Sequence, residues 1–141
     1  MSSRAFFLYT SSNDIAASRR FYNDLVGLDQ IWDEVGDIAY LIEDAVQLSI
    51  GHDPDAAVHT EWSFQPGWVF GLGLEPAPRL TVASWSIPLS PGSFSSAVGR
   101  LQKAGIAALR PEPFWVGYWS YVVKGPMGQT VELSDPVSAG P

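Results

Sequence analysis

The chain repeats one order of predicted elements twice, and this repetition limits the possible folds more than any other feature. In the first half, a strand predicted at residues 4–10 is followed by a helix that begins after Asp14 and by three short strands. In the second half, a strand at residues 83–89 precedes a helix that ends at Gly105, and three strands follow again. Apolar residues alternate in the strands and recur at helical spacing in the helices. The sequence therefore predicts an α+β fold built from two βαβββ modules.

The two halves can be aligned residue by residue. Matching Gly27 with Gly105 and Asp14 with Ser93 superposes the helices at an offset of 79 residues, less one at the turn. The remaining strands are predicted at residues 30–35, 38–42 and 46–50 and at residues 108–114, 118–123 and 130–134. We therefore predict one domain over residues 1–141, with module one at 4–52, a connection at 53–82 and module two at 83–136.

The connection between the modules is long for a compact domain and rich in aromatic residues. It contains Trp62, Phe64, Trp68 and Phe70. Loops of this length without secondary structure are uncommon and are usually packed or functional. A large exposed apolar patch between Trp62 and Phe70 would favour a subunit or regulatory module that binds another protein.

Charge is distributed unevenly along the chain. The sequence has 8 basic and 15 acidic residues, for a net charge of −7. No Lys or Arg occurs from Phe21 to Pro78, where eleven of the acidic residues lie, so this part carries −11 and the remainder +4. Such a field repels phosphate backbones and anionic lipids, so we expect neither nucleic acid nor a membrane as a partner. A cationic partner is favoured.

Several kinds of chemistry are excluded by composition. The chain has no cysteine, which excludes disulfides, thiolate catalysis and cysteine-ligated metals. Its two histidines, His52 and His59, lie in or beside the connection at a spacing that fits no metal motif known to us. No apolar run approaches the ~20 residues of a membrane helix. Because Met1 to Arg4 lead straight into a predicted strand without a secretory segment, we expect a cytoplasmic protein.

Two segments resemble the vicinal oxygen chelate superfamily, which includes glyoxalase I, bleomycin-resistance proteins and extradiol dioxygenases. They are DIAASRRFYNDLVGL at residues 14–28 and GPMGQTVELSDP at residues 125–136. The resemblance covers residues 4–52 and 83–136 and leaves the connection unmatched. It implies two βαβββ modules whose mixed sheets curl around a concave groove. It also implies a homodimer, in some members with modules exchanged between chains.

The resemblance also implies where a metal would bind. Enzymes of the superfamily hold a divalent metal with one side chain from the first and one from the last strand of each module. The matching positions here are Phe7, Gln47, Ser86 and Glu132. A Phe cannot coordinate a metal and a Ser hydroxyl is a poor ligand, so this quartet is degraded. We therefore predict no metal and no other cofactor, which argues against glyoxalase, dioxygenase and epimerase chemistry of the family type.

Alternation along the strands predicts which side chains face the groove and which face the core. We use Glu132 as the reference, because its position matches a metal ligand of the family. The predicted groove set is Phe7, Tyr9, Gln47, Ser49, Ser86, Thr130, Glu132 and Ser134. The predicted core set is Phe6, Leu8, Val46, Leu48, Ile50, Trp85, Ile87, Val131 and Leu133.

Aromatic residues are the remaining source of binding surface. The chain has six Trp, of which Trp32 lies beside two acids and Trp115 and Trp119 flank a predicted hairpin. Aromatic faces attract cations and stack on planar rings, although most such residues also serve in packing. The predicted ligand-binding residues are Phe7, Tyr9, Trp32, Tyr40, Gln47, Ser86, Trp115, Trp119 and Glu132.

These features favour a binding protein without catalytic residues. It is similar to the bleomycin-resistance branch, whose members sequester a cationic, aromatic antibiotic without catalysis. The predicted function is capture of a cationic or aromatic antibiotic or metabolite in an acidic, aromatic groove. One alternative is a divalent-metal-dependent lyase, isomerase or dioxygenase with unusual ligands. Another is a metal-free enzyme in which Glu132 acts as a general base.

Overall fold

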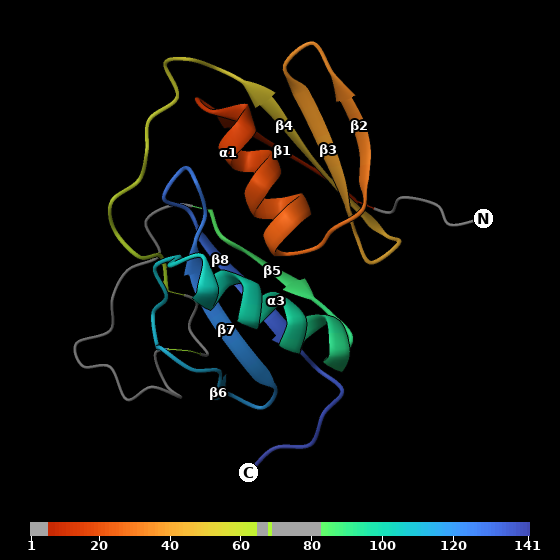
Figure 1. Cartoon of the computed structure of the whole chain (residues 1–141), viewed down its shortest axis with the longest axis vertical. Coiled ribbons are helices and arrows are strands. Elements are labelled where there is room, and N and C mark those ends of the chain that lie inside the picture. The colour runs from red at the N-terminus through yellow and green to blue at the C-terminus, as the bar shows by residue number, and fades with distance from the viewer. Residues whose placement is uncertain (1–5, 65–67, 69–82) are drawn as a thin grey trace.

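The computed structural model describes residues 6–64, 68 and 83–141, which include module two and module one from residue 6 onward. Residues 4 and 5 of the predicted first strand lie outside the described residues. The structure contains two four-stranded sheets, and one helix covers each sheet on the same side of the molecule (Figure 1). This is the predicted α+β architecture. Among the described residues, no helix is long and apolar enough to cross a membrane.

The first module follows the predicted order of elements. Its elements are β1 (Phe6–Ser12), α1 (Ile15–Arg19), the π-helical segment η1 (Arg20–Leu25), β2 (Gln30–Glu34), β3 (Asp37–Ile42) and β4 (Val46–His52). The strand order in the sheet is β1-β4-β3-β2. β1 pairs with β4 in parallel and the other pairs are antiparallel.

The second module has the same topology, so the internal repeat is confirmed. Its elements are β5 (Trp85–Pro88), α3 (Pro91–Lys103), β6 (Phe114–Trp115), β7 (Trp119–Lys124) and β8 (Thr130–Asp135). The strand order is β5-β8-β7-β6, and β5 pairs with β8 in parallel as β1 does with β4. The first and last strands of each module are therefore neighbours at the same place in each sheet.

The helix of module one begins at a side-chain cap and changes from an α-helix to a wider π-helix at Arg20. The carboxylate of Asp14 accepts a hydrogen bond from the backbone N–H of Ala17 at 3.0 Å, as an N-cap residue does. In η1 the bonding changes to five-residue spacing, with the Val26 N–H donating to the Phe21 carbonyl at 2.9 Å. The wider turn directs the adjacent pairs Phe21–Tyr22 and Leu25–Val26 into the core together. This arrangement departs from the predicted regular helix.

The two helices pack together over a single hydrophobic core. The Arg100 guanidinium of α3 donates to the Leu25 carbonyl at the end of η1, at 2.8 Å. The predicted core set lies in this cluster or packs against it, except Phe6, which is 60% exposed. The prediction for Phe6 was wrong because this residue begins β1, an edge strand of its sheet.

One predicted strand is largely absent. Residues 108–114 contribute a single bridge, from Ala108 to Val123, before the two-residue strand β6 begins at Phe114. Pro111 and Pro113 lie in this stretch and lack the N–H that a strand ladder requires. The prolines explain why the segment leaves the sheet.

Candidate functional site

The strand registers bring the four predicted metal positions together in two pairs. Phe7 of β1 lies opposite Gln47 of β4, and Ser86 of β5 lies opposite Glu132 of β8. Both pairs lie on the sheet faces that the helices leave uncovered. The two modules therefore each contribute one structurally equivalent half of the predicted site.

The uncovered face of module one is an aromatic surface open to solvent. Phe7 and Tyr9 are 47% and 73% exposed, and their rings stack with centroids 6.4 Å apart and planes 17° apart. Trp32 of the edge strand β2 is 51% exposed and pairs with Ala39 of β3. Three large aromatic faces therefore remain free on one side of this sheet.

A pocket of about 400 Å³ lies on this face. Tyr9 and Trp32 contribute to its walls, and Gln47 and Ser49 contribute polar groups. The Gln47 amide nitrogen donates to the Ser49 hydroxyl at 3.1 Å, which leaves the amide oxygen as an acceptor. Asp37 adds a carboxylate to the lining. Aromatic walls with a few polar groups and one negative charge suit a flat cation.

The uncovered face of module two is organised around Glu132. This carboxylate is only 3% exposed and accepts three side-chain hydrogen bonds. Oε2 accepts from the Trp68 indole at 2.8 Å and from the Ser120 hydroxyl at 2.6 Å. The Tyr118 hydroxyl lies 2.9 Å from Oε2 and 3.2 Å from Oε1. All three donors are neutral, and no cationic side chain among the described residues forms an ion pair with this carboxylate.

Part of the connection packs onto the same face. The Ser63 backbone N–H donates to the Thr130 hydroxyl at 2.8 Å, two residues before Glu132 on β8. Lys124 donates to the Glu61 carbonyl at 2.6 Å and lies 4.9 Å from the centre of the Trp62 ring. Described residues of the connection therefore cover part of the predicted groove.

Trp68 is buried, with 2% exposure, and does not form the exposed apolar patch considered for residues 62–70. Phe70, the other end of that stretch, lies outside the described residues. A pocket of about 320 Å³ remains beside Trp68, and Ser86, Tyr118 and Glu132 also line it. Gln47 therefore lines the pocket on module one, whereas Ser86 and Glu132 line a different pocket on module two.

The structure places three of the predicted ligand-binding residues, Tyr40, Trp115 and Trp119, on the helix-covered faces of their sheets. Tyr40 lies opposite Leu48 in the core and is fully buried. Its hydroxyl donates to the Gln30 side chain at 2.8 Å, and burial raises the pKa of this phenol to about 12. The prediction that Tyr40 contacts a ligand in the groove is thereby corrected, because its side chain packs under the helix.

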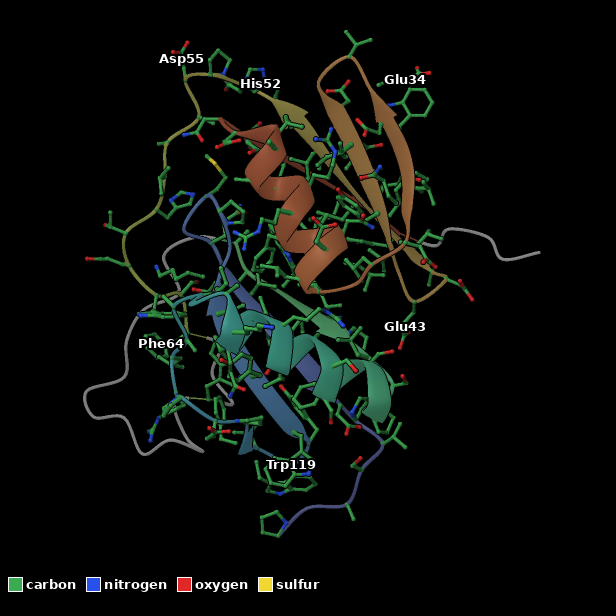
Figure 2. The ribbon with its side chains drawn as sticks, viewed as in Figure 1. Glu34, Glu43, His52, Asp55, Phe64 and Trp119 are labelled. Atoms are coloured by element: carbon green, nitrogen blue, oxygen red, sulfur yellow. The ribbon has the colours of Figure 1, made fainter. Side chains whose placement is uncertain are left out.

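Trp115 and Trp119 are the other two corrections. They pair across β6 and β7, and their rings meet edge to face with centroids 5.5 Å apart. Trp119 shares the alternation of the core residue Tyr121, and its indole donates to the Ala139 carbonyl at 3.0 Å. Figure 2 shows Trp119 near one end of the molecule's long axis, far from Glu34, which ends β2 near the other end. These tryptophans pack on the helix-covered side of sheet two instead of facing the groove.

The residues at the quartet do not fit a catalytic divalent metal. Phe7 has no donor atom, and the Ser86 hydroxyl lies within hydrogen-bond distance of the Ser134 hydroxyl, at 3.3 Å. Glu132 directs one of its oxygens at three protein donors, which leaves that oxygen poorly suited to a metal. Within the described ranges, no three His, Cys, Asp or Glu side chains lie close enough together to hold a metal ion.

Sequence reasoning missed three residues that hold Glu132. Ser120 and Tyr118 share the alternation of Val122, which lies opposite Glu132, so strand pairing could have identified them. No periodic signal marks Trp68, because its contact with Glu132 spans 64 residues of sequence.

Comparison with known proteins shows the fold. No protein-family model and no curated protein matches the chain. Among solved structures, a glyoxalase/dioxygenase from Nostoc punctiforme has a TM-score of 0.69 at 19% identity, over 94% of this chain and 90% of that one. The fosfomycin resistance protein FosX from Mesorhizobium loti has a TM-score of 0.61 at 12% identity, over 96% and 92%. A glyoxalase/bleomycin resistance protein from Catenulispora acidiphila has a TM-score of 0.59 at 17% identity, over 94% and 98%.

Proposed function

We propose that this chain, which has the fold of the vicinal oxygen chelate superfamily, captures a flat cationic or aromatic small molecule without a metal. Proteins of this fold include the glyoxalase/dioxygenase, fosfomycin resistance and bleomycin resistance proteins named above. The fold alone does not choose between enzyme and binding protein. The proposal therefore rests on the residues that line the uncovered faces.

The observation that carries the proposal is the open aromatic face of module one. Phe7, Tyr9 and Trp32 expose their rings on this face. Tyr9 and Trp32 line the pocket together with Gln47 and Asp37, and Phe7 stacks on Tyr9. A ligand ring can stack on these faces, while a positive charge on the ligand is attracted by the ring faces and by the carboxylate. Capture of this kind needs no catalytic residue. We propose that it takes place in the cytoplasm and that the ligand is an antibiotic or a metabolite.

Two neighbouring residues provide a matched test. Phe6 and Phe7 are both exposed and adjacent in β1, but alternation places them on opposite faces of the sheet. We expect Phe7→Ala to weaken the binding of bleomycin about tenfold in a tryptophan fluorescence titration, because it removes a stacking face. Phe6→Ala should bind as the unmodified chain does. Ethidium, a second flat aromatic cation, serves as an additional probe. The proposal is refuted if the folded protein binds neither bleomycin nor ethidium, or if the two variants change binding equally.

An enzymatic alternative makes a different prediction. A metal-dependent lyase, isomerase or dioxygenase would bind a stoichiometric divalent ion through Gln47 and Glu132. Elemental analysis of protein purified without chelators measures this directly. A bound ion that is lost in both Gln47→Ala and Glu132→Ala would replace the proposed function with the enzymatic one.

We further propose that the protein is a homodimer in which module one of one copy faces module two of the other. Counted by module, residues 4–52 carry a charge of −5 (8 acidic, 3 basic) and residues 83–136 carry +1 (3 acidic, 4 basic), so the facing modules of two copies would have charges of opposite sign. The exposed aromatic face of module one would then gain a second wall. Sedimentation velocity should show a dimer at low salt whose dissociation increases with salt concentration. A monomer under all conditions would contradict this arrangement.

A further inference from the structure

The two oxygens of Glu132 differ in how many hydrogen bonds they accept. Oε2 accepts from Trp68, from Ser120 and, at the shorter distance, from Tyr118. Among the described residues, Oε1 accepts only the 3.2 Å contact from the same Tyr118 hydroxyl. An ionised carboxylate has about four acceptor sites, so Oε1 retains capacity for a further donor. A buried carboxylate oxygen with unfilled acceptor sites destabilises the fold, because it has lost hydrogen bonds to water that no protein donor replaces. An added donor would remove this penalty.

A molecule bound in the pocket beside Glu132 would supply that donor. Its volume of about 320 Å³ lies at the lower end of the range for small-molecule sites. Trp68 provides an aromatic wall, and Ser84, Ser86 and Tyr118 contribute hydroxyl-bearing side chains to the lining. The described residues that line this pocket include no Lys or Arg, so none of them neutralises the charge that Glu132 presents to a cationic guest.

We propose that this pocket is a subsite for a cationic heterocycle that donates a ring N–H to Oε1 of Glu132. The proposal rests on the proposed function and adds to it the class of ligand. Trp68 already shows the preferred interaction, because its own ring N–H donates to the other oxygen of the same carboxylate. The guest repeats this contact on Oε1, which accepts a single 3.2 Å contact from the part of the chain that the structure describes. Charge-assisted hydrogen bonds of this kind are short and stronger than neutral ones.

Two probes of equal charge test the subsite by calorimetric titration. Protonated 2-aminobenzimidazole carries ring N–H donors, whereas 1,3-dimethylbenzimidazolium has the same bicyclic core and charge without them. We expect the unmodified protein to bind the N–H probe about tenfold to hundredfold more tightly, the range for a hydrogen bond to a charged group. Glu132→Gln should abolish this preference. Asp44→Asn removes one charge at an exposed turn and should leave the preference intact.

Tyr118→Phe gives a second test that keeps the carboxylate. Removing the hydroxyl frees both oxygens from its shared hydrogen bond, so the N–H probe should bind more tightly while the dimethyl probe is unaffected. Equal binding of both probes to the unmodified protein, or no change in Tyr118→Phe, would overturn the subsite but not the proposed function. If neither benzimidazole probe binds, and bleomycin and ethidium do not bind either, the subsite and the proposed function are both overturned.

Discussion

Trp68→Phe is the substitution that most directly measures how strongly the connection is held on module two. The variant keeps an aromatic ring in the buried position but removes the indole N–H that donates to Glu132 at 2.8 Å. Loss of a hydrogen bond to a charged group costs about 1.5–3 kcal/mol. The smaller ring leaves apolar surface unfilled, which adds about 1 kcal/mol. We therefore expect the free energy of unfolding to fall by about 2.5–4 kcal/mol.

The assay is urea denaturation followed by far-ultraviolet circular dichroism, with Trp62→Phe as the matched control. Trp62 is also in the connection, but it is half-buried and its contact is the Lys124 ammonium 4.9 Å from its ring. A Phe at this position keeps most of that interaction, so a loss below about 1 kcal/mol is expected. The reasoning is refuted if Trp68→Phe unfolds within about 0.5 kcal/mol of the unmodified protein, or if both variants lose the same amount.

Three other predictions concern the packing that holds the modules in place. Arg100→Met should lower the free energy of unfolding by about 1.5–3 kcal/mol in the same assay, since it removes the donor to the Leu25 carbonyl, and Arg100→Lys should lose less. Gly128→Ala should lower it by more than about 2 kcal/mol and speed amide exchange at His59, because the residue has φ +73° and an added Cβ would overlap the His59 carbonyl. The hydroxyl and N–H of Ser138 and the N–H of Val137 donate to Asp135 and lower the pKa of its carboxyl. The carboxylate therefore stabilises the fold above its unfolded pKa of about 3.9, and this stabilisation is lost as the pH falls from there through the lower folded pKa. Asp135→Asn should therefore be less stable at pH 7, and the difference from the unmodified protein should shrink as urea denaturation is repeated down to pH 3; a constant difference would contradict this assignment.

Sequence periodicity predicted the fold because the repeat and the alternation are local properties. Leu48 and Leu133 are buried in the core, and Phe7 and Ser86 lie opposite Gln47 and Glu132 as the alignment of modules required. A strand that alternates between a core and an uncovered face specifies its own orientation. The repeat and the alternation alone therefore predict that Phe7 pairs with Gln47 and Ser86 with Glu132.

The errors have physical causes that periodicity does not capture. The prediction that Trp115 and Trp119 bind ligand rests on their residue type. Their face is set by the pairing of β7 with β8, and that register depends on contacts distant in sequence. Tyr40 could have been placed by alternation, since it lies opposite Leu48. The contact of Trp68 with Glu132 depends on how the connection crosses module two, for which the sequence offers no repeat or spacing.

The central claim is that ligand binds on the uncovered faces of the two sheets. The indole N–H signals of the six tryptophans in a ¹H–¹⁵N correlation spectrum, assigned by single Trp→Phe variants, test it most directly. Addition of protonated 2-aminobenzimidazole should shift the signals of Trp32 and Trp68, which line the two pockets, and leave those of Trp115 and Trp119 in place. Shifts confined to Trp115 and Trp119, or no shift at saturating probe, would contradict the account.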